Sequence, residues 1–84
     1  MAKILYFARL REQLGLASED VRLPENVRSV GALIAVLRAR GGHWAEALAD
    51  ESRVHVAVNC SMAGMCNAVQ DDDEIALFPP VTGG

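Results

Sequence analysis

The C-terminal sequence reads Glu74-Ile75-Ala76-Leu77-Phe78-Pro79-Pro80-Val81-Thr82-Gly83-Gly84, a strand-like segment followed at once by two prolines and a Gly-Gly end. The β-branched and aromatic residues of its first part predict a strand. Proline fixes φ at about −65° and donates no backbone hydrogen bond, so the pair ends the strand. We therefore predict a folded domain over residues 1–78 and an extended, flexible tail over residues 79–84.

The Gly-Gly end gives the tail a terminal carboxylate with no side chain around it. Because glycine lacks a Cβ atom, such a tail can enter a channel that would exclude any other residue. The residues after Pro79 reach roughly 17 Å when extended. The alternative is an ordinary frayed chain end without a function, and the tail alone leaves both interpretations open.

Upstream of the tail, the hydrophobic pattern predicts one main helix and several strands. The helix is expected after Ser29, a residue type favoured at N-caps. Its apolar side chains recur at helical spacing, at Val30, Leu33, Ile34 and Leu37. Strands are expected at 3–8, 19–23 and 54–58, with a short one around 64–69, and helical turns at 9–14 and around 44–48.

The first predicted strand is apolar on both faces, because Ile4 and Tyr6 alternate with Leu5 and Phe7. A strand of this kind is buried on both sides or offers one side to a partner. One helix packed across a mixed sheet of four or five strands gives an α+β roll. With the first and last strands adjacent in the middle of the sheet, we predict the β-grasp (ubiquitin-like) fold, whose tail leaves from the centre.

The composition is that of an ordinary globular domain, with 84 residues of which 51% are hydrophobic and 23% charged. The formal net charge of −3 argues against nucleic acid or an anionic membrane as the main partner. No apolar run approaches the roughly 18 residues of a membrane span, and the N-terminus has no signal-peptide pattern. We therefore expect a cytoplasmic protein.

Other residues with potential chemistry do not form a recognisable site. Cys60 and Cys66 have neither redox spacing nor a well-placed histidine for zinc, so we expect free thiols and no metal. His43 and His55 have no partner at metal or triad spacing, and His55 is expected at an edge or on the surface. The acidic stretches 19–20 and 71–74 are expected to form a solvated rim and a turn, not paired catalytic carboxylates.

Four segments together resemble the small, sulfur-carrying subunit of molybdopterin synthase. They are Ile4-Leu5-Tyr6-Phe7-Ala8-Arg9-Leu10-Arg11-Glu12, Val58-Asn59, Asp73-Glu74-Ile75-Ala76 and Phe78-Pro79-Pro80-Val81-Thr82-Gly83-Gly84. The tail is the most specific of them: a bare Gly-Gly also fits ubiquitin or the thiamin sulfur carrier, but the whole run Phe78-Pro79-Pro80-Val81-Thr82-Gly83-Gly84 points to this family. One departure is Asp72, which stands where the family often has a turn glycine. Aspartate tolerates the left-handed conformation better than most residues.

The resemblance implies that Gly84 carries sulfur as a thiocarboxylate. A free carboxylate is ionised at neutral pH and inert to nucleophiles, so it must first become an acyl-adenylate, whose AMP is displaced by sulfur from a donor. The chain has no glycine-rich phosphate-binding motif that would hold ATP. We therefore expect no bound cofactor, with ATP used by a separate adenylyltransferase that resembles the ubiquitin-activating type.

The resemblance also implies a partner that uses the sulfur. The large synthase subunit would take the charged tail and transfer its sulfur to cyclic pyranopterin monophosphate, building the molybdopterin dithiolene. Two tails are consumed per product, in keeping with a heterotetramer of two small and two large subunits. This chain would be the sulfur-donating, non-catalytic subunit of that transferase complex.

Each tail residue then has an expected role. Gly84 reacts, Gly83 gives clearance, Thr82 and Val81 contact the channel, and Pro80 and Pro79 aim the arm. On the folded domain, three apolar residues are expected to form a patch for the large subunit: Phe7, Met62 and Phe78. The alternative is that these three belong to the core.

Three other functions remain open. The same tail could supply sulfur for thiamin or for tRNA thiolation, which the co-purifying large partner would reveal. The chain could be a ubiquitin-like modifier joined to lysines, which a stable isopeptide ladder would reveal. It could also be a plain interaction domain, in which removal of the tail would change nothing.

Overall fold

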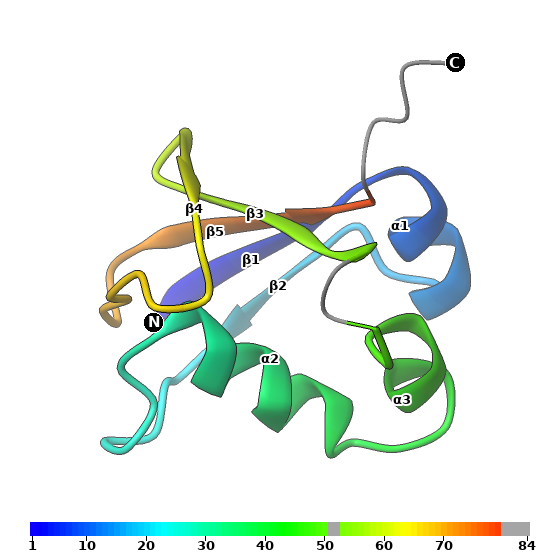
Figure 1. Ribbon diagram of the computed structural model, residues 1–84, viewed down its shortest axis with the longest axis horizontal. Coiled ribbons are helices and arrows are strands. Elements are labelled where there is room, and N and C mark those ends of the chain that lie inside the picture. Colours follow the sequence, from blue (N-terminus) through cyan, green and yellow to red (C-terminus); the bar gives the residue numbers. More distant parts are fainter. Residues whose placement is uncertain (51–52, 80–84) are drawn as a thin grey trace.

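The computed structural model describes residues 1–50 and 53–79, and residues 51–52 and 80–84 lie outside the described part. The elements follow in the order β1 (Ala2–Tyr6), α1 (Ala8–Leu14), β2 (Ser18–Val21), α2 (Val30–Arg38), α3 (His43–Ala47), β3 (His55–Val58), β4 (Ser61–Ala63) and β5 (Glu74–Phe78). The strands form a mixed sheet in the order β2-β1-β5-β3-β4 (Figure 1). β1 runs parallel to β5, and the other neighbouring pairs are antiparallel. The predicted β-grasp arrangement is confirmed.

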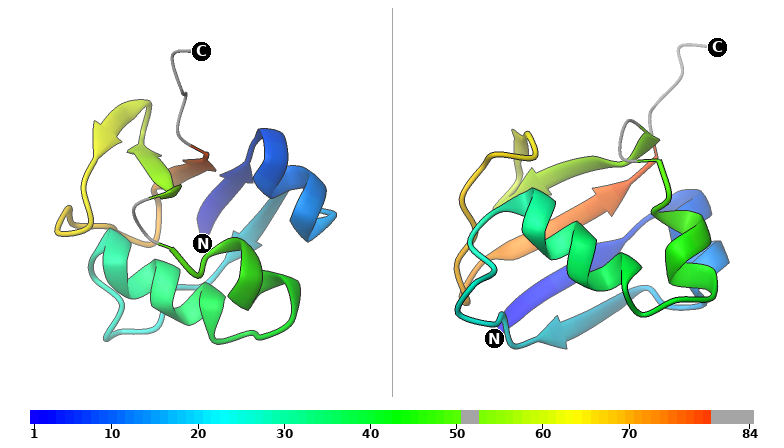
Figure 2. Two further views of the ribbon diagram at one scale, coloured as in Figure 1. Left: turned by 45° about the vertical axis from the view of Figure 1, so that its right-hand side comes forward. Right: turned by 60° about the horizontal axis from the view of Figure 1, so that its bottom comes forward.

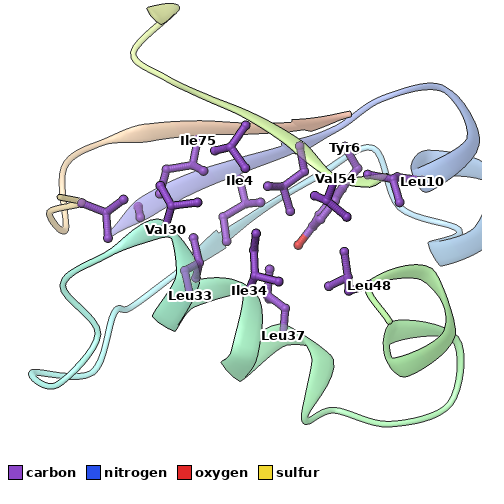
Figure 3. Packing of buried hydrophobic residues seen from close by; sticks show 14 of the residues in the cluster. Ile4, Tyr6, Leu10, Val30, Leu33, Ile34, Leu37, Leu48, Val54 and Ile75 are labelled. Atoms are coloured by element: carbon purple, nitrogen blue, oxygen red, sulfur yellow. The ribbon is translucent and has the colours of Figure 1, made fainter. Parts of the chain in front are cut away.

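Helices α2 and α3 lie on one side of the sheet, and no described helix covers the opposite side (Figure 2). Alternate residues of each strand point toward this helix layer, as the two-residue period of a strand requires. The buried side chains Ile4, Tyr6, Val56, Ile75 and Leu77 pack with Val30, Leu33, Ile34 and Leu37 of α2 (Figure 3). Full burial of a side chain of this size contributes roughly 1.5–3 kcal/mol, so the predicted apolar stripe holds α2 on the sheet.

Helix α2 begins at the predicted cap. The Ser29 hydroxyl oxygen accepts a hydrogen bond from the backbone N–H of Ala32 at 3.2 Å. The N–H of Gly31 donates to the carbonyl of Met65 at 2.9 Å. A Cβ atom on Gly31 would lie 3.3 Å from that oxygen. The glycine inside the apolar stripe therefore lets the loop after β4 approach the start of the helix.

The first strand is shorter than predicted. It ends at Tyr6 rather than residue 8, because Ala8 has a φ of 52° and begins α1. A residue in this left-handed region cannot continue a strand. The end of α1 is as predicted: Gly15 has a φ of 67°, and its N–H donates to the carbonyl of Arg11 at 3.0 Å.

The short strand predicted around 64–69 lies earlier, at Ser61–Ala63. Val58 and Ser61 are paired, so Asn59 and Cys60 alone make the turn between β3 and β4. Their φ values are 51° and 70°, the conformation that favours Asn-Gly in two-residue hairpin turns. Because cysteine stands where glycine is usual, the sequence lacks the common signal for this hairpin.

The turn before β5 needs no left-handed residue at Asp72, contrary to the expectation from the family pattern. Among the described non-glycine residues, positive φ occurs at Ala8, Asn59 and Cys60. The turn is closed instead by Asp73, whose carboxylate accepts the N–H of Gln70 at 2.8 Å and whose own N–H donates to the carbonyl of Gln70 at 3.1 Å. An aspartate side chain therefore stabilises a turn that glycine would otherwise make.

Candidate functional site

The tail begins at the centre of the sheet. Strand β5 pairs with β1 on one side and with β3 on the other, so its end is held by two neighbours. Half-buried Pro79 follows directly. The other tail residues named from the sequence (Pro80, Val81, Thr82, Gly83 and Gly84) lie outside the described residues. What the structure describes of the predicted site is therefore the root of the tail and the surfaces around it.

The helix-free face of the sheet carries two rows of mainly apolar side chains near this root. Strand register places the first row side by side across four strands: Leu5, Ala76, Ala57 and Met62. The second row lies at the tail end of the sheet and contains Phe7, Phe78 and His55. We call these seven residues the apolar strip.

A backbone hydrogen bond places Phe7 in the second row. Tyr6 is in register with Leu77, and the N–H of Phe7 donates to the carbonyl of Leu77 at 3.1 Å. Phe7 is extended, with φ −123° and ψ 154°, so its side chain points away from the core that buries Tyr6. Phe7 therefore lies beside Phe78 on the uncovered face.

The predicted patch residues lie outside the buried core. Phe7 is 46% exposed and Met62 is 65% exposed, while Phe78 is half-buried in the strip. Single exposed apolar residues are ordinary, but a contiguous apolar area across several strands is typical of a surface that meets another molecule. That the patch binds a large subunit stays a prediction.

Of the two positions expected for His55, a sheet edge or the surface, the structure excludes the edge and leaves the side chain half-buried. Strand β3 lies between β5 and β4, and His55 is in register with Phe78. The two rings are 5.9 Å apart between centroids and tilted by 38°. A half-buried imidazole thus forms one end of the second row, a position that depends on strand order and that local sequence could not reveal.

A groove of about 560 Å³ opens at the root of the tail, between α1 and the segment that follows α3. It is lined by Ala8, Arg9, Leu10, Gln13, Glu46, Ala47, Ala49, Asp50, Arg53 and Pro79. Its walls combine apolar side chains with charges of both signs. Because Pro79 is part of the wall, a protein that encloses the tail from its root also meets α1 and the end of α3. The groove could not be predicted from the sequence, since it is formed by elements far apart in the chain.

The opposite end of β5 is fastened by side chains. Asn59 donates from Nδ2 to the carboxylate of Asp73 at 2.9 Å, and its Oδ1 accepts the N–H of Glu74 at 3.0 Å. The N–H of Asn59 also donates to the carbonyl of Glu74 at 2.8 Å. Two of the short family-like segments, Val58-Asn59 and the one starting at Asp73, therefore meet in space and set the register of the strand that leads into the tail.

Glu19 is not part of a solvated rim, contrary to expectation. Its carboxylate accepts a hydrogen bond from the Tyr6 hydroxyl at 2.7 Å and two from the Arg40 guanidinium at 2.9 and 3.1 Å. Arg40 also lies over the Trp44 ring, 4.4 Å from its centroid. Burial opposes ionisation of Glu19, but the hydrogen bonds from Arg40 and Tyr6 outweigh it and hold the pKa of the carboxyl below its ordinary value. Burial, with Glu19 adding to it, raises the pKa of Tyr6.

This cluster is a structural link, because it ties β1 and β2 to the connection between α2 and α3.

Within residues 1–50 and 53–79, no group of three or more His, Cys, Asp or Glu side chains could hold a metal ion. None of the described helices has the length and apolar character that crossing a membrane requires. The described part of the chain thus offers a tail root, an apolar strip and a groove as its candidate functional surfaces.

The sequence from residue 4 to residue 84 matches the ThiS family. The chain belongs to that family. Two curated molybdopterin synthase sulfur carrier subunits, from Haemophilus influenzae and Escherichia coli, are 37% and 38% identical to it over 84 residues, which is the whole of each chain. The recognition made from the four sequence segments is confirmed.

Two further similarities extend this comparison. A solved structure from Pyrococcus furiosus, described as a candidate molybdopterin converting factor, subunit 1, is 34% identical and superposes with a TM-score of 0.75, covering 95% of this chain and 97% of its own. Small archaeal modifier protein 3 of Haloferax volcanii is 30% identical over 90 residues, covering 98% of this chain and 97% of that protein. The relatives of this chain thus include proteins named as sulfur carriers and one named as a modifier.

Proposed function

We propose that this chain is the sulfur carrier subunit of molybdopterin synthase. The observation that carries the proposal is its full-length similarity to two curated subunits of that name. A central β5 that ends directly at Pro79 supports it, because a tail rooted between two strands leaves the domain from a rigid base. The chain works in the cytoplasm in this proposal and binds no cofactor of its own.

The chemistry of the tail follows from its carboxylate. A partner adenylyltransferase joins the Gly84 carboxylate to the AMP portion of ATP, and pyrophosphate leaves. Sulfide from a donor then attacks the acyl carbon, AMP leaves, and a thiocarboxylate remains on Gly84. In the large subunit, this sulfur passes to cyclic pyranopterin monophosphate, and water restores the carboxylate. The prolines at 79–80 and the glycines at 83–84 serve reach and clearance.

The apolar strip is the proposed docking surface for the large subunit. Its aromatic and methionine side chains are of the kind that dominate the energy of protein interfaces. The strip adjoins the tail root, so docking there places the root next to the same partner. Two carriers per product are supplied by a proposed heterotetramer of two small and two large subunits.

Deletion of Gly84, or addition of one residue after it, tests this function. Either change should abolish molybdopterin synthesis in a strain that lacks the native carrier, because no carboxylate remains at the required place. The melting temperature of the variant should equal that of the unaltered chain, since the change alters none of the buried core residues. Growth of the deletion strain on a medium that demands a molybdenum enzyme would refute the proposal.

A second measurement reads the sulfur directly. The intact mass of the protein from its native cells should include a form heavier by the difference between a sulfur and an oxygen atom.

A second candidate function, conjugation to lysines, is favoured by the similarity to small archaeal modifier protein 3. That function predicts isopeptide-linked adducts that survive denaturation, whereas the carrier function predicts the thiocarboxylate mass and a co-purifying large subunit.

A further inference from the structure

The outer side of β2 is an open edge of the sheet. β2 pairs with β1 alone, and Figure 2 shows it as the outermost strand, with no other part of the described chain along its outer side. The N–H of Tyr6 donates to the carbonyl of Ala17 at 2.9 Å. Because an antiparallel ladder alternates, Glu19 and Val21 also bond to β1, and the intervening Asp20 turns its N–H and C=O outward.

The chain continues this alternation past the end of β2. The N–H of Leu23 donates to the carboxylate of Asp71 at 3.0 Å, and that carboxylate lies 3.3 Å from the N-terminal amino group, next to the start of β1. The N–H of Leu23 thus points toward β1, so the backbone groups of Arg22 point outward like those of Asp20. Pro24 has no N–H and ends this outward row.

The side chains of β2 select one register for pairing with a second copy of the same strand. An unpaired edge is a template for another strand, and two copies of β2 can pair antiparallel about a twofold axis. An axis at Glu19 or Asp20 sets two carboxylates opposite each other, and an axis at Arg22 sets two guanidinium groups opposite each other, which is unfavourable. An axis at Val21 instead sets Asp20 of each copy opposite Arg22 of the other, and these are the residues whose backbone groups point outward.

We propose that β2 is a self-association surface, through which two copies of this chain pair antiparallel about a twofold axis at Val21 and form one continuous sheet. Asp20 of each copy and Arg22 of the other exchange backbone hydrogen bonds and bring opposite charges together. Within its own chain, Asp20 is in register with Lys3 of β1, and Asp71 interacts electrostatically with Arg22. Charges of alternating sign therefore run across the contact. The proposal does not depend on the proposed function.

Apolar side chains on the helix side favour the same register. Val21 is half-buried and faces the helix layer, so an axis there brings the two Val21 side chains together. Val36 of α2 is 38% exposed and lies outside the apolar strip. It is on the flank of α2 toward β2, because Arg40, one turn later, reaches Glu19. The apolar strip lies on β1, β5, β3 and β4, so pairing through β2 leaves it uncovered.

The test is sedimentation equilibrium of the purified full chain at low salt and about 0.02–2 mM, because so short a contact belongs to the weak class of interfaces. The unaltered chain should show a reversible monomer–dimer equilibrium. Asp20→Lys and Arg22→Asp each set like charges opposite each other, so each should raise the dissociation constant roughly tenfold. An equimolar mixture of these two variants restores opposite charges and should associate more strongly than either variant alone.

Two control variants separate this contact from other causes of association. Glu12→Lys makes the same charge change as Asp20→Lys, at an exposed position on α1, and should leave the dissociation constant of the dimer unchanged. Phe7→Ala alters the apolar strip and should also leave it unchanged. Hydrogen exchange keeps the inference testable if a charge variant folds poorly. In the unaltered chain, the amide protons of Asp20 and Arg22 should exchange more slowly as the protein concentration rises.

Four outcomes would overturn the inference. They are a chain that stays monomeric at the highest concentration, association that both charge variants leave unchanged, a mixture that associates no better than its components, and association that Phe7→Ala abolishes. None of them bears on the proposed function, which the changes at Gly84 test separately.

Discussion

At the scale of single residues, Cys60 occupies a backbone conformation that suits glycine. It is the second residue of the turn between β3 and β4 and has a φ of 70°. Removing its Cβ relieves left-handed strain but adds freedom to the unfolded chain. We expect Cys60→Gly to raise the free energy of unfolding by roughly 0.5–1 kcal/mol, measured by urea denaturation. Cys66→Gly, where φ is not positive, should give no gain, and equal effects of the two variants would refute this account of the turn.

Glu19 gives a second prediction at this scale. Replacing it by Gln removes the charge that Arg40 and Tyr6 stabilise, and should lower the free energy of unfolding at pH 7 by roughly 1–2 kcal/mol. Because the folded-state pKa of Glu19 lies below its ordinary value of 4.5, its contribution is present above that pH and is lost as pH falls through the folded pKa. The difference in free energy of unfolding between the unaltered chain and Glu19→Gln should therefore become smaller at acid pH. Asp20→Asn, an exposed change on the same strand, should show no comparable difference at either pH.

At the scale of elements, the strip on β1, β5, β3 and β4 should affect binding more than stability. Phe7→Ala removes a 46% exposed ring, so it should cost about 1 kcal/mol of stability, well below the roughly 3–5 kcal/mol of a core phenylalanine. Its affinity for the large subunit should fall by roughly 2 kcal/mol, or about 30-fold. Val36→Ala, a partly exposed change on α2 in the opposite layer, should leave affinity unchanged. A collapse of the melting temperature with unchanged affinity would place Phe7 in the core.

The elements also show what local sequence can and cannot predict. Helix α2 was predictable because its apolar stripe and Ser29 cap are local patterns, and the two apolar faces of β1 anticipated the exposed position of Phe7. The end of β1 and the place of β4 depend on positive φ at Ala8 and Cys60, residue types that give no local sign of it. The position of His55 and the groove at the tail root depend on which strands and helices become neighbours. The hydrophobic period of a single segment does not show which other segments become its neighbours.

At the scale of the whole molecule, the two ends of β5 have different roles. Its first end is fastened by Asn59 and Asp73, and its last end passes through Phe78 to Pro79. Five residues of strand span roughly 15 Å. Cys60 lies in the turn at the fastened end, and the loop that contains Cys66 also lies away from the tail end of β5 (Figure 1). The body thiols and the tail root are therefore on opposite sides of the domain.

This separation decides whether the cysteines can take part in sulfur transfer. A sulfur on Cys60 or Cys66 would stay fixed to the body and could not follow the tail into a channel. The residues between these two cysteines (Ser61, Met62, Ala63, Gly64 and Met65) supply no cation that would activate a thiol. The neighbours of Cys66, Met65 and Asn67, accept hydrogen bonds from the first residues of α2, so Cys66 lies at the start of that helix and not at the tail root. The Cys60→Ser, Cys66→Ser double variant should accept sulfur at Gly84 and support dithiolene formation at close to the normal rate, measured with the purified large subunit. If the variant accepts sulfur at Gly84 normally but fails to deliver it, Cys60 or Cys66 takes part in the transfer. A thiocarboxylate on the tail would then not be sufficient for dithiolene formation.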